Sequence, residues 1–319
     1  MPGPESVFKQ STLGRLVFFS LLTVLLLKAK DYVPAVGFWG LFFSPLPLAL
    51  LGCREGRRLL GLGMLLTGGL TAFFLPIPSA LYFVTASVPL SAVLAASSRK
   101  SWSGGEALLA CTFVSVAEKL FFFFLLWALT GHNFLAPDVG QMEEMMERLY
   151  AGFSSGLQET IAMRENMRQT AALLPYMTPS MLLLYAGLDA LCNYKLCGYF
   201  QRGQANRPPA LPAFTEWRFP KSLLPAFFLA FVINLLWGLD EWRAGALFAA
   251  NLELVLNVLF FVEGLSLAFW WIGRRGLGPV LRTLAAVLLL IPLAWPWQVL
   301  MGIGDIVFDF RSRTTHRRT

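Results

Sequence analysis

Charged side chains inside apolar stretches are the residues of this sequence whose types and spacing point to chemistry. Glu118 and Lys119 lie about halfway along the apolar run from residue 106 to residue 131. Neighbouring residues of a helix point about 100° apart, so we expect each of the two to pair with another helix rather than with the other. A charge at the middle of a bilayer costs about 2.5–3.5 kcal/mol, and such groups therefore face a partner or an aqueous cavity. Both a structural ion pair and contact with a substrate or proton fit this position.

The densest set of polar residues lies on a later apolar run, residues 244–272. Glu253 and Asn257 are one helical turn apart, and Glu263 lies within about 120° of their stripe. Asn234 on the preceding run is expected to reach the same interior. Lys119 is a candidate counter-charge for Glu253 or Glu263, because an unpaired buried carboxylate tends to protonate. The predicted substrate-binding residues are thus Glu118, Lys119, Asn234, Glu253, Asn257 and Glu263.

Two smaller groups have simpler interpretations. Asp189 and Asn193 are four residues apart and share a helical face, which suits either a structural or a functional role. Asp305 and Asp309 share a face if the chain is helical there, and Asp309 precedes Arg313 by four residues, a favourable spacing for an ion pair. A pair of aspartates without a third ligand favours a helix cap at the membrane edge over metal or phosphoryl chemistry.

No complete catalytic or cofactor motif occurs in the chain. The sequence lacks G-x-x-x-x-G-K-[ST], G-x-G-x-x-G, H-E-x-x-H and a nucleophile elbow. We therefore expect no enzyme activity, no cofactor and no ATP-driven pump that acts alone. The cysteines have neither zinc nor redox spacing and are expected to be small core residues: Cys53, Cys111, Cys192 and Cys197.

The elements that carry these residues are membrane helices. Of the 319 residues, 56% are hydrophobic and 14% charged, and the mean hydropathy is +0.60. A bilayer core takes roughly 20 apolar residues as a helix, and the runs are helix-sized without the alternation of a membrane barrel. The predicted fold is all-α: a polytopic transmembrane helical bundle of eight or nine membrane helices plus an amphipathic extramembrane helix. The candidate runs are 12–28, 32–52, 58–75, 78–97, 106–131, 171–197, 221–240, 244–272 and 279–300.

The positive charge reports topology rather than nucleic-acid binding. The net charge is +7, but the basic residues cluster at the ends of the apolar runs. The positive-inside rule then places the N-terminus in the cytoplasm of a multi-pass protein in a bacterial cytoplasmic (inner) membrane. The basic tail after residue 310 conflicts with one more crossing. Pro292 and Pro296 offer a re-entrant alternative for residues 279–310, and both versions stay open.

Two polar stretches divide the chain into segments. Residues 1–197 are predicted to form an N-terminal bundle of about six helices that includes an outward insertion, residues 138–170. Its methionine-rich face, from Met142 to Phe153, predicts an amphipathic helix that covers apolar ends, closes over a cavity as a lid, or docks a partner. A second helix is expected to run from about residue 157 into the next span. A proline-rich cytoplasmic loop, 198–220, precedes the C-terminal membrane helices and basic tail, 221–319.

Short motifs along nearly the full length resemble the YybS-like family of bacterial membrane proteins. They are Phe43-Ser44-Pro45-Leu46-Pro47, Gly52-Cys53-Arg54-Glu55-Gly56, Trp217-Arg218-Phe219-Pro220, and the ending from Gly304-Asp305 to Asp309-Phe310-Arg311. The first six helices are also distantly similar to the substrate-binding subunits of energy-coupling-factor vitamin transporters. That likeness implies a small nutrient bound in a helical bundle and partner ATPase subunits. The Ala-x-x-x-Ala docking motif of those subunits is absent, and Gly14 to Phe18 lies near its position.

These features predict an integral membrane protein that binds or transports a small solute. Its expected partners are the lipid bilayer, a small-molecule solute, and ATPase or other membrane subunits, with no nucleic acid. The alternative is a non-transporting membrane scaffold or regulatory protein that recruits partners through the 198–220 loop and the basic tail. A membrane enzyme that uses Asp305 and Asp309 is a third, weaker possibility.

Overall fold

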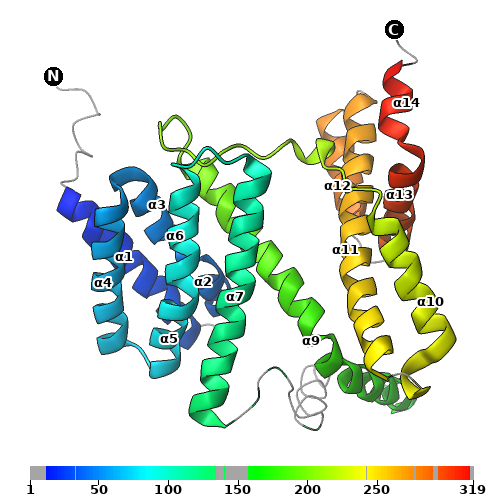
Figure 1. Cartoon of the computed structure of the whole chain (residues 1–319), viewed down its shortest axis with the longest axis horizontal. Helices are drawn as coiled ribbons and strands as arrows, with labels where there is room; N and C mark the ends of the chain where they lie inside the picture. The colour runs from blue at the N-terminus through cyan, green and yellow to red at the C-terminus, as the bar shows by residue number, and fades with distance from the viewer. Residues whose placement is uncertain are drawn as a thin grey trace. The chain divides into compact units, whose positions relative to one another are not determined.

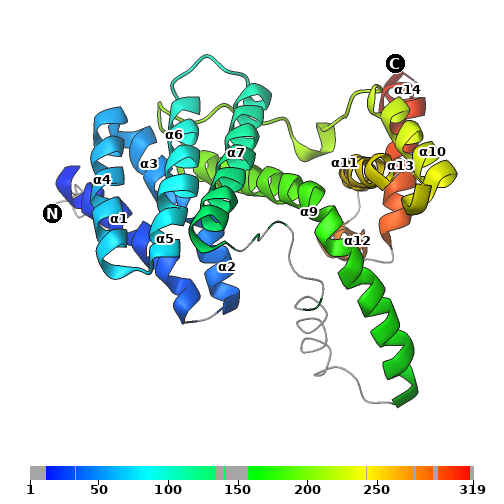
Figure 2. The same cartoon turned by 60° about the horizontal axis from the view of Figure 1, so that its bottom comes forward.

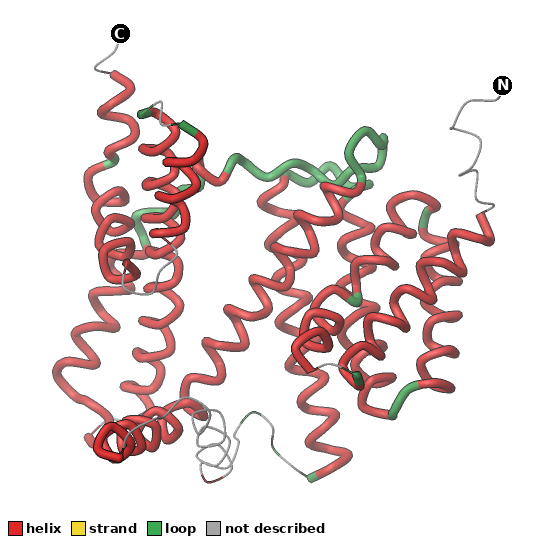
Figure 3. Tube along the Cα trace, turned by 180° about the vertical axis from the view of Figure 1, so that it is seen from behind, coloured by secondary structure: helices red, strands yellow, loops and turns green. Residues whose placement is uncertain are grey.

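The computed structural model of the chain contains helices joined by loops, and no strand, in the part that it describes (Figure 3). The described residues are 12–316, except 33, 132, 134, 136–139, 141–156, 242, 276–277 and 290–293. The predicted amphipathic helix from Met142 to Phe153 lies outside them. The chain divides into two compact units, which are described separately. Unit 1 comprises residues 1–137 and 182–211, and unit 2 comprises residues 138–181 and 212–319.

Unit 1 is a bundle built around a short, buried helix. Residues Pro45–Cys53 of α3 are all buried, and helices α1, α4 and α6 pack against α3 (Figure 1). The elements of unit 1 are α1 (Thr12–Lys28), η2 (Ala29–Asp31), α2 (Pro34–Phe43), α3 (Pro45–Glu55), α4 (Arg57–Phe74), α5 (Ile77–Tyr82), η3 (Phe83–Ser87), α6 (Val88–Ser97), α7 (Gly104–Thr130) and α9 (Leu157–Phe200) from residue 182 onward.

Two helices of unit 1 are interrupted beside the buried centre. The apolar run expected at 32–52 is split at Ser44 into α2 and α3, because Pro45 and Pro47 lack the N–H groups that would continue the hydrogen-bond ladder. The run expected at 78–97 contains a π-helical turn, η3, between α5 and α6. Pro89 removes the donor for the carbonyl of Thr85, four residues before it. Turns of this kind are frequent at functional sites.

Helix α7 has a clear start signal at its N-terminus and a clear stop signal at its C-terminus. The Ser103 hydroxyl accepts the N–H of Glu106 at 3.2 Å, and the Glu106 carboxylate accepts the N–H of Ser103 at 2.8 Å, which together form a capping box. Gly131 ends the helix in the left-handed region, at φ 72°. The 27 residues between these caps carry Glu118 and Lys119 at the middle, as the sequence predicts.

Unit 2 is organised by a close helix pair. Its elements are the first part of α9, η4 (Phe214–Glu216), α10 (Leu223–Glu241), α11 (Arg243–Arg274), α12 (Pro279–Leu289), α13 (Trp295–Phe308) and α14 (Phe310–His316). Helices α11 and α13 touch backbone to backbone, since a Cβ atom on Gly264 would collide with the carbonyl of Gln298 and one on Gly302 with that of Phe260. Small residues at a crossing allow this approach in membrane helices.

Helix α9 confirms the expected continuation of a helix from about residue 157 (Figure 2). It is 44 residues long and contains Pro175 and Pro179. Within unit 2, the Asn251 side chain bridges the proline-containing turn. Its amide donates to the Tyr176 carbonyl at 2.7 Å and accepts the Ser180 N–H at 3.1 Å. A side-chain amide thus serves backbone groups at the point where prolines disturb the ladder.

Membrane-spanning character is carried by several of these helices. Among the described residues, three helical segments are long and apolar enough to cross a bilayer, Ile77–Ser97, Gly104–Thr130 and Ala244–Arg274. Leu223–Leu236 is a shorter apolar helix. The prediction of eight or nine membrane helices is therefore not confirmed, whereas the all-helical fold is. The last expected run, 279–300, corresponds to two separate helices, α12 and α13.

Candidate functional site

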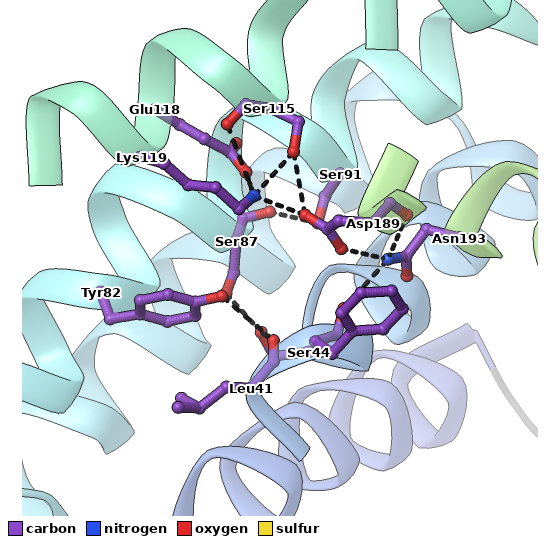
Figure 4. Close-up of polar contacts among 11 residues, drawn as sticks. Leu41, Ser44, Tyr82, Ser87, Ser91, Ser115, Glu118, Lys119, Asp189 and Asn193 are labelled. Carbon is purple, nitrogen blue, oxygen red and sulfur yellow. Dashed lines mark hydrogen bonds and ion pairs between the residues drawn. The ribbon is translucent and has the colours of Figure 1, made fainter. Parts of the chain in front are cut away.

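A cluster of buried charged and polar side chains surrounds the ammonium group of Lys119 in unit 1 (Figure 4). The Lys119 Nζ atom lies 2.5 Å from Asp189 Oδ2, 2.6 Å from Ser115 Oγ and 3.2 Å from Glu118 Oε1. Ser115 Oγ also donates to Asp189 Oδ2 at 2.9 Å. The side chains of Lys119, Glu118 and Asp189 are all buried, so the carboxylates have little water to solvate them. We call this group the Lys119 cluster.

Helices α7 and α9 bring the charges of the Lys119 cluster together. Ser115 and Lys119 are four residues apart and therefore share a face of α7, directed at Asp189 on α9. The prediction that Glu118 and Lys119 do not pair directly is wrong. The length of the two side chains lets the ammonium group reach back to its neighbour although the two Cβ atoms point apart.

Asn193, one turn after Asp189, connects the cluster to the interrupted helix α2–α3. The Asn193 amide donates to Asp189 Oδ1 at 2.8 Å and to the carbonyl of Phe42 at 2.9 Å. Phe42 lies in the last turn of α2, two residues before the break at Ser44, where backbone carbonyls can accept side-chain donors. The break therefore supplies an acceptor to the polar centre of the unit.

Hydroxyl groups extend this network to the π-helical turn. The Ser44 and Ser87 hydroxyls are 2.7 Å apart, and Ser91 donates to the carbonyl of Pro45 at 2.8 Å. The Tyr82 hydroxyl donates to the Leu41 carbonyl at 3.3 Å. Figure 4 shows these residues on the side of the cluster formed by α2, α3 and the turn that precedes α6. Both helix interruptions of unit 1 thus contribute polar groups to one region.

Two acceptor atoms in the Lys119 cluster lack a donor among the described residues. They are Oε2 of Glu118 and Oδ1 of Asn193, both fully buried. Two carboxylates also face a single ammonium group, which leaves one negative charge in excess when both are ionised. A buried acceptor without a donor costs about 1–3 kcal/mol, so the site is suited to receive one.

A second buried cluster lies in unit 2 around Arg311, and we call it the Arg311 cluster. Arg311 Nε is 2.9 Å from Asp305 Oδ2, and its Nη2 is 3.3 Å from Glu263 Oε1. The remaining carboxylate oxygens accept backbone donors, the N–H of Phe219 at 2.8 Å on Glu263 and that of Phe310 at 3.1 Å on Asp305. Every carboxylate oxygen of this cluster therefore has a backbone N–H or the guanidinium group within 3.3 Å.

The Arg311 cluster also holds the loop that precedes α10. Arg311 Nη1 donates to the carbonyls of Thr215 and Trp217 at 2.8 and 3.1 Å. Ser266, one turn along α11 from Glu263, donates to the Phe214 carbonyl at 2.6 Å. These bonds serve backbone groups that have no strand or long helix to satisfy them, which is a structural task.

The structure separates the predicted substrate-binding residues into three places. Glu118 and Lys119 belong to the Lys119 cluster, and Glu263 belongs to the Arg311 cluster. Asn234 donates to Glu253 at 2.6 Å, as expected for two residues that share an interior. Asn257 is half-buried on α11, between Glu253 and Glu263. The ten residues that separate those two glutamates span about 15 Å of helix, too far for one small site.

Two predicted pairings are wrong. Lys119 is not the counter-charge of Glu253 or Glu263, because its partners are Glu118 and Asp189 and the partner of Glu263 is Arg311. Asp305 and Asp309 do not share a helical face either. Asp309 takes the left-handed conformation, at φ 48°, which separates α13 from α14, and it pairs with Arg218 at 2.9 Å.

Four members of the clusters are not among the predicted substrate-binding residues: Ser115, Asp189, Asp305 and Arg311. The spacing of Ser115 and Lys119 on one face carries a signal for the first. Asp189 has the signal of a carboxylate on an apolar helix, and its companion Asn193 shares that face. Arg311 belongs to a basic C-terminal segment that gives no signal of burial, and the turn at Asp309 directs its side chain into the interior of unit 2.

Comparisons with known proteins give a family and one relative. The model of a family described as predicted membrane protein (DUF2232) matches residues 21–306. The chain is 21% identical over 301 residues to "Uncharacterized protein YybS" of Bacillus subtilis (strain 168), an alignment that covers 92% of this chain and 94% of the relative. No solved structure matches the chain.

Proposed function

The chain belongs to the DUF2232 family of predicted membrane proteins, and from this premise we propose that unit 1 binds a small solute at the Lys119 cluster. In this role it resembles the substrate-binding subunit of a transporter. The proposal keeps Glu118 and Lys119 as solute-binding residues and adds Asp189 and Asn193. Asn234, Glu253, Asn257 and Glu263 are assigned to the structure of unit 2.

The single observation that carries the proposal is the pair of buried acceptors, Glu118 Oε2 and Asn193 Oδ1, that have no donor in the part of the chain that the structure describes. A fold loses stability by keeping such atoms unpaired, and a ligand that supplies donors recovers it. The excess negative charge selects the kind of donor. A small solute with an ammonium group, or with several hydroxyl or amide N–H groups, complements this site.

The two helix interruptions give the proposal a second support. Non-helical backbone at membrane depth occurs where it is buried in protein or lines a cavity, and discontinuous helices form the binding sites of many transporters. Here the break at Ser44 and the turn Phe83–Ser87 both place groups beside the cluster.

The proposal is tested by what the purified protein carries. Detergent-purified wild type and Glu118→Gln are extracted with organic solvent, and the released small molecules are compared by mass spectrometry. We expect a compound that is enriched in wild type and reduced about tenfold in Glu118→Gln, the effect of losing roughly 1.4 kcal/mol of binding. Glu253→Gln, which changes an equal charge in unit 2, is the matched control and keeps the compound.

The opposite result favours the scaffold alternative. If no small molecule is enriched, or if both variants retain it equally, the Lys119 cluster is not a solute site. A cytosolic protein that co-purifies stably with the wild type then supports a role in recruiting partners, whereas ATPase subunits in the same preparation support transport.

A further inference from the structure

A second candidate site lies in unit 1, away from the Lys119 cluster. A cavity of about 720 Å³ opens where the start of α1, the end of α3 and the loop after α9 meet. It is lined by Arg15, Phe18, Phe19, Cys53, Arg54, Gln201, Gln204, Ala205 and Asn206. Among the described residues, this lining contains two guanidinium groups, three side-chain amides and no carboxylate.

The polar part of the lining matches a phosphate group. Arg15 is paired with Glu55, which uses only part of a side chain that has five N–H donors. Arg54 is exposed, and its contacts to Gln201 Oε1 and to the Phe200 carbonyl are both 3.4 Å, longer than ordinary N–H···O bonds. Its guanidinium fork is therefore available for a stronger acceptor, and planar forks suit phosphate oxygens.

Gln201 shows that the cavity has a built polar wall. Its side chain is fully buried, yet it lines the cavity, and its hydrogen bonds with Arg54 and with the Leu50 carbonyl are both long, at 3.4 Å. A buried amide that is held between a helix end and an arginine can turn a donor towards an anion. The cavity thus offers charge from Arg54 and directed hydrogen bonds from Gln201.

The apolar part of the surroundings indicates where the rest of the ligand lies. Phe18 lines the cavity and is half exposed, and the neighbouring exposed residues Val17, Leu21 and Leu25 are spaced four residues apart along α1. This stripe suits an acyl chain that descends from a headgroup. The basic residues near this end predict that it faces the cytoplasm, where anionic lipids attract basic pockets between membrane helices.

We propose that this cavity binds the phosphate headgroup of an anionic phospholipid, with the acyl chains along the exposed face of α1. Free inorganic phosphate has the same headgroup chemistry but has no acyl chain to contact the exposed apolar residues of α1. The two sources are therefore distinguished by whether Phe18 contributes to binding.

The test measures lipid retained by the full-length protein. Wild type is purified from micelles with equal amounts of phosphatidylglycerol and phosphatidylethanolamine, and bound lipids are counted by native mass spectrometry. We expect selective retention of phosphatidylglycerol, reduced about tenfold in Arg54→Gln. Arg57→Gln removes the same charge from an exposed arginine outside the cavity and keeps the lipid.

A second pair of variants tests the acyl chain. Phe18→Ser is expected to lower phosphatidylglycerol retention several-fold, whereas Phe73→Ser, which truncates an exposed phenylalanine of α4, leaves it unchanged. Equal loss in Arg54→Gln and Arg57→Gln overturns the proposal in favour of general surface charge. Binding of millimolar inorganic phosphate through Arg54 that is indifferent to Phe18→Ser, with no selective lipid retention, overturns the lipid as the ligand. Thermal unfolding of each variant confirms that it is folded.

Discussion

The Lys119 and Arg311 clusters contain the same charges but differ in how those charges are satisfied. Each has two buried carboxylates and one cation. In the Arg311 cluster, backbone N–H groups of Phe219 and Phe310 complete the set of donors. In the Lys119 cluster, Glu118 Oε2 has no donor among the described residues. Two clusters of equal charge composition therefore differ in how their carboxylate oxygens are paired.

The reason for the difference lies in the backbone that reaches each cluster. A loop and a helix end approach the Arg311 cluster, so free N–H groups are at hand to bond the carboxylates. Helices α7 and α9 approach the Lys119 cluster through their interiors, where most N–H groups are used by the helices' own ladders, and the interrupted helix α2–α3 presents the Phe42 carbonyl. Carbonyls cannot serve a carboxylate. A polar site between helices is thus left open unless a ligand supplies donors.

The largest expected loss of stability follows from removing the cation of the Arg311 cluster. Arg311→Met leaves Glu263 and Asp305 buried without a counter-charge and also frees the carbonyls of Thr215 and Trp217. Breaking a buried pair costs about 3–5 kcal/mol, and we expect the upper end of that range. Thermal unfolding in detergent measures the loss, and limited proteolysis should show faster cleavage within the 212–222 loop. A variant as stable as wild type would remove the structural role assigned to this cluster.

A slightly smaller loss of stability is expected when the cation of the Lys119 cluster is removed. Lys119→Met leaves Glu118 and Asp189 without a cation, at a cost of about 3 kcal/mol, but it releases no loop. The double variant Lys119→Met with Asp189→Asn should recover part of the melting temperature, because one of the uncompensated charges is then gone. If the double variant is no better than the single one, the Lys119–Asp189 pair does not govern the stability of unit 1.

The helix crossing that positions the Arg311 cluster gives a third test. Gly264 follows Glu263, and its Cβ substituent would meet the Gln298 carbonyl of α13. We expect Gly264→Ala to destabilise unit 2 by about 1–3 kcal/mol through overpacking. Gly273→Ala on the same helix has open space around it and is the matched control. Equal melting temperatures for the two variants would contradict the backbone contact between α11 and α13.

The smallest effect on stability is expected at Asp309, a partly exposed residue two positions before Arg311. The Ser312 side chain, with lesser help from Arg218 and Lys221, holds the pKa of Asp309 below its ordinary value. A depressed pKa means that Asp309 stabilises the fold above the pKa of the unfolded chain and loses this effect as the pH falls through the folded value. Asp309→Asn should lower the melting temperature slightly at pH 7, by the equivalent of about 0–1 kcal/mol.

The pH dependence of that difference provides its check. The gap between wild type and Asp309→Asn is expected to be constant at neutral pH, to shrink below about pH 4, where unfolded aspartate titrates, and to narrow in high salt. A gap that widens on acidification would contradict the sign of the pKa shift.

The sequence predicted the helices better than their contacts. Apolar runs gave the bounds of α1, α4 and α7 to within a few residues, because a continuous run in lipid has no other stable conformation. The break at Ser44 was visible only as two prolines. The π-helical turn had no distinct signal, since Pro89 is equally compatible with an ordinary kink.

Pairing between buried charges was not accessible in the same way. Hydropathy shows that Lys119 and Glu263 are buried, but their partners depend on the rotation of each helix about its axis. Lys119 and Asp189 are 70 residues apart in the chain. The burial of Arg311 was harder still to predict, because the sequence around it is typical of an exposed basic tail. Only the backbone turn at Asp309 brings this arginine into the interior of unit 2.

The π-helical turn of Phe83–Ser87 acts as a one-residue insertion within a helix. An extra residue advances everything after it by about 100° around the helix axis. A chain with one residue fewer here keeps a continuous helix of ordinary pitch, yet Ser91 faces away from the carbonyl of Pro45 that it now bonds. Within such a helix, the number of residues in the turn decides which side chains of α6 face inward. Relatives with a single deletion here would therefore share the fold but lose the hydrogen bond that Ser91 makes.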